Sequence, residues 1–112
     1  MKTIFDVYSD PGHGWVKVPF KTLVDLDLVD RISHYSYCRN GHAYLEEDND
    51  FSLLLESLLA RGITPKFREH IGRTRPSKIR TYLCYTPHVV RNYFAVKLAT
   101  RATSVAAFCS RV

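Results

Sequence analysis

Few cysteines and no long apolar run separate this 112-residue chain from several classes of protein. Its cysteines, Cys38, Cys84 and Cys109, are odd in number and widely spaced, which argues against a disulfide framework and favours a reducing compartment. No apolar run approaches the roughly 18 residues that span a bilayer. The N-terminus, with Lys2 and Asp6 in a strand-like run, is not typical of a signal peptide. We therefore expect a small soluble cytosolic domain, without membrane contact.

Short motifs for catalysis, metals and phosphates are also scarce. The sequence contains no His-Glu-x-x-His and no Cys-x-x-Cys, so it predicts no metal site. The acids at 46–50 could attract a divalent cation, but compensation of a helix dipole explains them more simply. A glycine-rich phosphate loop is missing. His13 could act as an acid or base, yet it has no predicted partner. We expect a protein without catalytic residues or a cofactor, and a small hydrolase or nuclease is the weaker alternative.

Acidic residues are common in the first half of the chain and rare in the second. Residues 1–60 carry five basic and ten acidic side chains, whereas residues 61–112 carry eleven basic side chains and one acidic one. From residue 83 onward no acidic side chain occurs. A basic surface of this kind can meet phosphates or an acidic protein patch, although the two halves could also neutralise each other within the fold.

The first 29 residues predict a hairpin followed by a helix. Residues 2–8 and 15–18 are rich in β-branched and aromatic residues, which favour strands. Between them, Asp10-Pro11-Gly12-His13 is typical of a type II turn, in which the glycine takes a positive φ. A helical apolar stripe from Pro19 continues through about residue 29.

A second hairpin is predicted around Asn40-Gly41, which lies between two runs of strand-forming residues. This dipeptide favours a two-residue type I′ turn, because both of its positions then have positive φ. The register that follows places Arg39 opposite His42 and Tyr37 opposite Tyr44, and it leaves open which face meets solvent. One face then carries Tyr35, Tyr37, Arg39, His42 and Tyr44, and the other carries Ser36, Cys38, Ala43 and Leu45.

The remaining elements complete an α+β fold, expected as a small antiparallel sheet of two hairpins plus an edge strand, packed on two helices. They comprise a core helix at 50–61 with an Asn or Asp cap, an edge strand at 65–68, a mobile basic loop at 69–77, a strand at 78–82 and a C-terminal helix at 88–108. Residues 1–82 are predicted to form one domain. Residues 83–112 are predicted to be a basic and apolar extension, which could pack on the body or join copies into a homo-oligomer.

Two candidate binding surfaces follow from this arrangement. A basic stretch with interleaved aromatic residues suits phosphate neutralisation and base stacking, and it would equally suit an acidic protein surface. A second surface is rich in tyrosine and arginine, which are frequent in protein–protein hot spots, although these tyrosines could instead form a core face. The candidate binding residues are Tyr35, Tyr37, Arg39, Tyr44, Lys66, Arg68, Arg73, Arg75, Lys78, Arg80 and Tyr82.

Residues 1–82 contain five short motifs: Asp10-Pro11-Gly12-His13-Gly14-Trp15, Ile32-Ser33-His34-Tyr35-Ser36-Tyr37, Tyr44-Leu45-Glu46-Glu47-Asp48, Lys66-Phe67-Arg68-Glu69 and Lys78-Ile79-Arg80-Thr81-Tyr82. Together these motifs resemble those of small proteins carried by bacteriophages and mobile elements. The resemblance implies no catalytic residue. It implies a setting, the cytoplasm of a bacterial host cell, in which small accessory proteins bind a host defence or nucleic-acid-processing complex.

The leading hypothesis is therefore a non-enzymatic, phage-type accessory protein that inhibits a host protein or ribonucleoprotein complex, in the manner of an anti-CRISPR protein. The alternative is a single-stranded DNA- or RNA-binding protein that uses the same basic and aromatic residues. No helix-turn-helix, zinc-finger or RNA-recognition-motif signature is present, which disfavours sequence-specific duplex reading.

Overall fold

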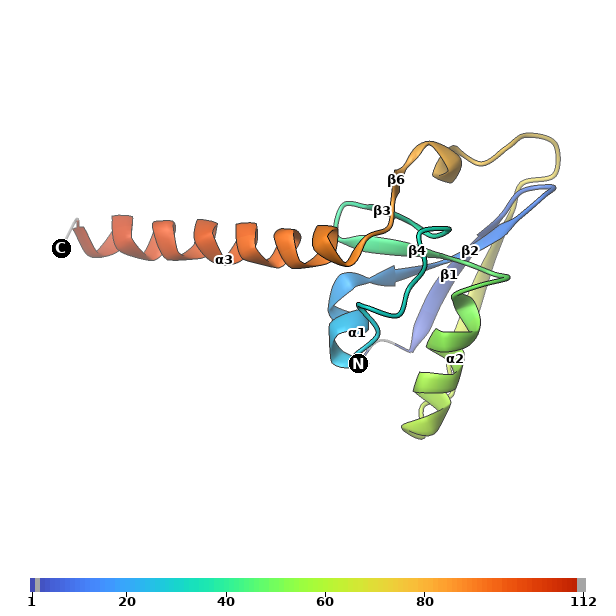
Figure 1. Ribbon diagram of the computed structural model, residues 1–112, viewed down its shortest axis with the longest axis horizontal. Helices are drawn as coiled ribbons and strands as arrows, with labels where there is room; N and C mark the ends of the chain where they lie inside the picture. Colours follow the sequence, from blue (N-terminus) through green and yellow to red (C-terminus); the bar gives the residue numbers. More distant parts are fainter. Residues whose placement is uncertain (2, 111–112) are drawn as a thin grey trace.

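The computed structural model describes residue 1 and residues 3–110, with side chains described through residue 101 apart from residue 2. The expected α+β class is confirmed by a six-stranded sheet with three α-helices (Figure 1). In chain order the elements are β1 (Ile4–Ser9), β2 (Gly14–Pro19), α1 (Phe20–Asp25), β3 (Tyr37–Arg39), β4 (His42–Glu46), α2 (Phe51–Ala60), β5 (Lys66–Ile71), the 3₁₀ helix η1 (Lys78–Thr81), β6 (Leu83–Cys84) and α3 (Pro87–Ser110).

The sheet is mixed rather than wholly antiparallel. Its strand order is β5-β1-β2-β4-β3-β6, and β1–β2, β2–β4, β4–β3 and β3–β6 are antiparallel pairs. The edge strand β5 lies beside β1 in parallel, with Phe5 opposite Phe67. This orientation corrects the antiparallel prediction. It arises because α2 carries the chain back along one face, so that β5 begins beside the start of β1 (Figure 1).

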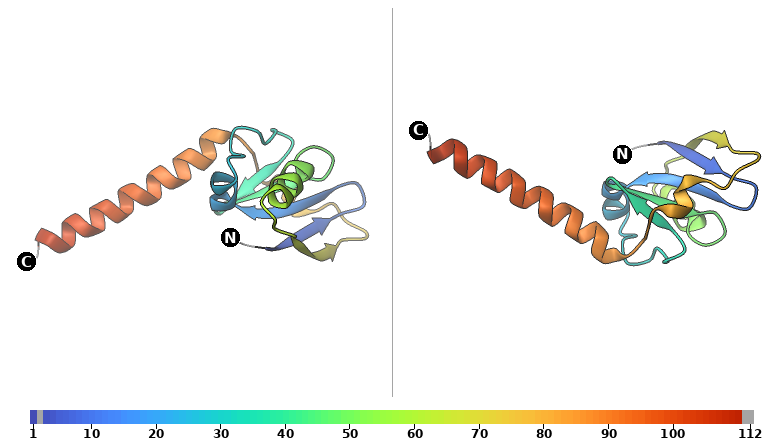
Figure 2. Two further views of the ribbon diagram at one scale, coloured as in Figure 1. Left: turned by 90° about the horizontal axis from the view of Figure 1, so that it is seen from below. Right: turned by 90° about the horizontal axis from the view of Figure 1, so that it is seen from above.

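The two faces of the sheet are covered differently. Helices α1 and α2 pack on one face. The residues buried in this layer include Phe5, Val16 and Leu45 of the sheet and Leu54 of α2. The 3₁₀ helix η1 lies over the opposite face (Figure 2). There its Ile79 packs in a smaller cluster with residues of β2 and β4. The larger cluster is the main hydrophobic core, and the smaller one is rich in aromatic side chains.

The β3–β4 hairpin matches its sequence prediction in turn and register. Asn40 has φ 51° and Gly41 has φ 78°, so both turn residues are in the left-handed region. Tyr37 pairs with Tyr44, and Arg39 pairs with His42. Gly41 also lies against α3, because a Cβ atom there would be 2.5 Å from the hydroxyl oxygen of Tyr93.

Two helix predictions need correction at their ends. The first helix ends at Asp25 rather than near residue 29, and Asp27 has a positive φ of 57° just beyond it. The second helix spans Phe51–Ala60 as expected, but no side chain caps its N-terminus. The carboxylate of Asp50 instead accepts hydrogen bonds from Ser33 and Ser36. Tertiary partners have replaced the local cap that the sequence predicts.

The predicted strand at 78–82 is also wrong, because these residues form η1 and an extended exit from it. Ser77 caps this turn by accepting a hydrogen bond from the backbone N–H of Ile79 at 3.2 Å. The side chain of Ile79 is buried in the smaller cluster, while Arg80 reaches back to Asp10. These long-range contacts favour a tight turn over a half-exposed strand.

Helix α3 confirms the predicted C-terminal helix and extends away from the body (Figures 1 and 2). The chain enters it through the core, because β6 pairs with β3 and both Tyr85 and Val90 are buried. A domain boundary at residue 82 stays a prediction. The radius of gyration is 16.4 Å, above the roughly 13 Å of a compact chain of this length, because α3 projects. Among the described residues, no helix has both the length and the apolar character that a membrane crossing requires.

Candidate functional site

A polar cleft of about 330 Å³ opens beside the ends of β2 and β4, next to η1. Trp15 and Glu46 are register partners on these strands, so their side chains lie on the same face of the sheet. Tyr35 and Tyr37 add two aromatic side chains to its wall, and Arg80 reaches it from η1. The cleft therefore combines acids, a cation and aromatic rings from segments far apart in the sequence.

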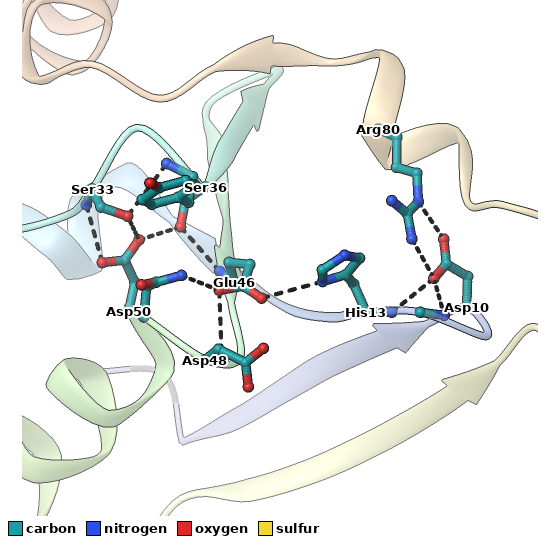
Figure 3. Close-up of polar contacts among 11 residues, drawn as sticks. Asp10, His13, Ser33, Ser36, Glu46, Asp48, Asp50 and Arg80 are labelled. Carbon is teal, nitrogen blue, oxygen red and sulfur yellow. Dashed lines mark hydrogen bonds and ion pairs between the residues drawn. The ribbon is translucent and has the colours of Figure 1, made fainter.

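The ion pair of Asp10 and Arg80 secures η1 to the β1–β2 turn (Figure 3). Two nitrogens of Arg80 donate to the carboxylate at 2.7 and 2.9 Å. Backbone N–H groups of Gly12, His13 and Ser77 donate to the same carboxylate at 3.0, 2.9 and 2.8 Å. The Asp10 side chain is 1% exposed. All its partners are donors, which suits a buried carboxylate.

The charge of Asp10 is strongly stabilised in this setting. The hydrogen bond from Arg80 is the largest cause, and it holds the pKa of Asp10 well below its usual range despite the opposing effect of burial. The same bond raises the pKa of Arg80. The turn also differs from its type II prediction, because Gly12 is not among the positive-φ glycines in the described part of the chain. Asp10 organises the turn through its side chain instead.

Three potential metal ligands meet at one end of the cleft. They are His13, Glu46 and Asp48, whose ligand atoms all lie within 4.8 Å of one another. Nδ1 of His13 is 3.5 Å from a carboxylate oxygen of Glu46 (Figure 3). Glu46 is buried, whereas His13 and Asp48 are exposed. This grouping differs from the sequence prediction, which assigns no ligands.

A second polar network supports the backbone beneath this cluster. Asp50 is buried and accepts hydrogen bonds from the backbone N–H and the hydroxyl of Ser33 at 3.0 and 2.7 Å. The hydroxyl of Ser36 also donates to Asp50, and its oxygen accepts from the backbone N–H of Glu46 at 3.0 Å (Figure 3). The turn at 33–36 is thereby joined to the end of β4, where Glu46 stands.

The predicted aromatic surface is divided by the fold. Tyr35 is 59% exposed and lines the cleft with Tyr37. Tyr44 is only 8% exposed and packs edge-on against Tyr82. Arg39 lies over the Tyr82 ring at 4.9 Å, on the side of a different groove beside α3. Burial raises the pKa of Tyr44. The hypothesis that these tyrosines form a core face holds for Tyr44 and not for Tyr35.

The predicted basic surface is also divided. Arg68 pairs with Asp6 at 3.0 Å, and Arg80 is held by Asp10. Lys66 begins β5, so its backbone is about 16 Å from the far end of that strand. The remaining three residues, Arg73, Arg75 and Lys78, are exposed and form no ion pair with any described residue. We refer to these three side chains, two from the loop between β5 and η1 and one from the first residue of η1, as the basic loop.

Sequence reasoning assigns no site role to Asp10, and it weighs a cation site at the acids of 46–50, which include Glu46, Asp48 and Asp50, but prefers helix-dipole compensation. Asp48 belongs to an acidic run that suggests helix capping, yet α2 has no acid in its first turn. Their meeting with His13 depends on the β2–β4 pairing, which joins segments about 30 residues apart in the sequence. The sequence signal available was the pair of motifs around His13 and Glu46, whose spatial relation is visible only in the fold.

Comparisons with known proteins give no relative, because no family model, curated protein or solved structure matches this chain. The resemblance to phage accessory proteins stays a prediction. Function is therefore inferred from the chemistry of the cleft and of the basic loop.

Proposed function

We propose that this protein is a non-enzymatic accessory protein of the bacteriophage type, which binds and inhibits a host defence or nucleic-acid-processing complex. The observation that carries the proposal is the basic loop. Its three cations lie within six residues, are exposed, and lack an internal counter-ion among the described residues. Such unneutralised charge steers association with an acidic or phosphate-rich surface and adds specificity at the contact.

The packing of the tyrosines favours a protein surface in this complex over free single-stranded nucleic acid. Binding of a single strand relies on rings that are open to stacking by successive bases. Tyr44 is buried, and Tyr82 is half-buried between Tyr44 and Arg39. Tyr82, a predicted stacking ring, and Tyr44, from the predicted tyrosine-rich surface, therefore already have partners within the protein.

The test is a quantitative pull-down from bacterial lysate with the tagged full chain and a triple variant, Arg73→Ala/Arg75→Ala/Lys78→Ala. The wild-type chain is expected to capture one complex in a fixed ratio, and the triple variant is expected to lose at least about 90% of it, because several interface cations act together. The matched control replaces three exposed cations elsewhere, Arg31, Arg61 and Arg101. Equal capture by wild type and triple variant would contradict the proposal.

Single-stranded nucleic acid is the second candidate, and one observation favours it. Tyr35 is exposed and stacks on His34 with ring centroids 4.5 Å apart. It also lines the cleft that contains Arg80. Fluorescence anisotropy with a labelled oligothymidylate tests this candidate. Two results together would support it. The logarithm of the binding constant would fall linearly with the logarithm of the salt concentration, and both Tyr35→Ala and the basic-loop variant would bind more weakly. An absence of binding at low salt would dismiss it.

A further inference from the structure

We propose that the cleft binds one divalent transition-metal cation, with Zn²⁺ as the representative ion, through His13, Glu46 and Asp48. This inference goes beyond the proposed function and does not depend on it. The three side chains come from the β1–β2 turn, the end of β4 and the turn that follows β4. They converge only in the folded protein (Figure 3).

The spacing of the donor atoms suits a single ion. Nitrogen and oxygen ligands lie about 2.0–2.2 Å from a tetrahedral Zn²⁺, so two ligands of one ion are separated by about 3.4 Å. The three donor atoms lie within 4.8 Å of one another, and His13 Nδ1 is already 3.5 Å from Glu46. Two of the three side chains are exposed and can change rotamer to close the ångström or so that remains.

The chemistry of the donor set selects the class of cation. Mg²⁺ and Ca²⁺ prefer sites made of oxygen atoms, whereas imidazole suits Zn²⁺ and its transition-metal neighbours. One imidazole with two carboxylates therefore favours a borderline divalent ion. Three protein ligands also leave a fourth position open, as in zinc sites that hold a water or an anion.

Glu46 is oriented for this role by its neighbours. One carboxylate oxygen accepts hydrogen bonds from the backbone N–H of Asp48 at 3.1 Å and from the side-chain amide of Asn49 at 2.5 Å. The other oxygen faces His13. Hydrogen bonds of this kind hold a ligating carboxylate in position around metal ions. The buried member of the cluster is thus preorganised, and the two exposed members complete it.

A second, independent observation points to an occupant of the same cleft. Trp15 lines the cleft and is 2% exposed. Its indole Nε1–H is the one buried side-chain polar atom without a hydrogen-bond partner in the described part of the chain. An indole N–H donates only, so it needs an acceptor. A water or an anion on the open position of the cation would bring such an acceptor into the cleft.

Zinc binding to the purified, chelator-treated full chain is the direct test. Calorimetry with Zn²⁺ alone is expected to show one saturable site. Co²⁺ is expected to quench the fluorescence of Trp15, the only tryptophan in the chain, with the same stoichiometry. The variants Asp48→Asn and His13→Ala are each expected to weaken binding at least about tenfold, since loss of a direct ligand costs no less than loss of an outer partner.

The chain offers two matched controls. Glu47→Gln removes the adjacent acid, whose carboxylate packs against Gly14 and is not part of the cluster. His70→Ala removes the histidine of the other histidine–carboxylate pair, with Asp6. Both controls are expected to bind Zn²⁺ like wild type.

The outcomes separate cleanly. Zinc binding that is absent, or that is unchanged in both ligand variants, or that falls equally in Glu47→Gln, would overturn the proposal. Because Asp48 is exposed, Asp48→Asn is expected to keep its fold, and a circular-dichroism melt checks this directly. The assay contains no host partner, so its failure and the failure of the proposed function are distinguishable.

Discussion

Two aspartate–arginine pairs extend from β1 and its turn, and they differ mainly in burial. The pair of Asp10 and Arg80 has an acid that is 1% exposed and takes three further backbone hydrogen bonds. The pair of Asp6 and Arg68 is of similar length, at 3.0 Å, but its acid is 17% exposed and its arginine is 65% exposed. The distance between the charged atoms is therefore a poor guide to how much each pair contributes to stability. The almost fully buried carboxylate of Asp10 depends on its protein partners, whereas the partly exposed carboxylate of Asp6 can also be hydrated by water.

Replacement of Asp10 should have the largest effect on stability. Asp10→Ala leaves the backbone donors of the turn and of Ser77 without their acceptor and frees Arg80 from η1. We expect a loss of about 3 kcal/mol in the free energy of unfolding, in line with buried charged hydrogen bonds. Urea denaturation followed by Trp15 fluorescence measures it. A loss below about 1 kcal/mol would contradict the expectation that the Asp10 pair stabilises the fold more than the Asp6 pair does.

The second-largest difference between the two pairs is expected in the pH dependence of the free energy of unfolding. Hydrogen bonds, chiefly from Arg80 to Asp10 and from His70 to Asp6, hold the pKa of both carboxyls in the folded protein below the usual value for aspartate. Their stabilisation is thus complete above the unfolded pKa and is lost as pH falls through the lower folded pKa.

The wild-type free energy of unfolding should therefore fall below about pH 4, and Asp10→Ala should show a flatter profile there. Asp6→Ala should keep most of the slope, because the pKa of Asp10 is lowered further. The measurement is a series of urea titrations between about pH 2 and pH 7. Equal flattening in the two variants would show that burial does not separate the pairs.

Asp6→Ala should cost less than about 1 kcal/mol at neutral pH, since its partners Arg68 and His70 remain solvated. The loss should shrink further in 1 M salt, because exposed pairs are screened. Thermal unfolding in low and high salt measures both effects. A salt-independent loss as large as that of Asp10→Ala would contradict this ranking.

The smallest effect is expected for an ion pair exposed at both ends. Lys21 and Asp25 pair at 2.9 Å on successive turns of α1, and 76% of the Lys21 side chain is exposed. Lys21→Ala should change the free energy of unfolding by no more than about 0.5 kcal/mol. The same urea titration checks it, and a larger loss would point to packing of the lysine stem instead.

Local chemistry made part of this fold predictable. Asn40 and Gly41 determine a turn within two residues, so the hairpin, its register and the small apolar face of Cys38 and Ala43 follow from the sequence. The helix at Phe51–Ala60 follows from its leucines and from Gly62 beyond it. In each case the residues that decide the structure are close neighbours in the chain.

Long-range partners decided the rest. The alternation at residues 78–82 predicts a strand, yet the attraction of Arg80 to Asp10 and the burial of Ile79 favour a 3₁₀ turn. The sequence predicts that Asp50 caps a helix, yet its carboxylate accepts hydrogen bonds from the hydroxyls of Ser33 and Ser36. The cluster at His13 and Glu46 requires strand pairing that no local pattern specifies. A single sequence therefore identifies candidate residues more readily than the distant residues with which they interact.

The close approach of Gly41 to Tyr93 places the turn of the β3–β4 hairpin directly against the N-terminal part of α3. With 24 residues, α3 is about 36 Å long, so a tilt of about 10° at its root would swing its far end by about 6 Å. Any side chain at position 41 would press on that root. A side chain at position 41 is therefore expected to displace the start of α3 from the β3–β4 hairpin.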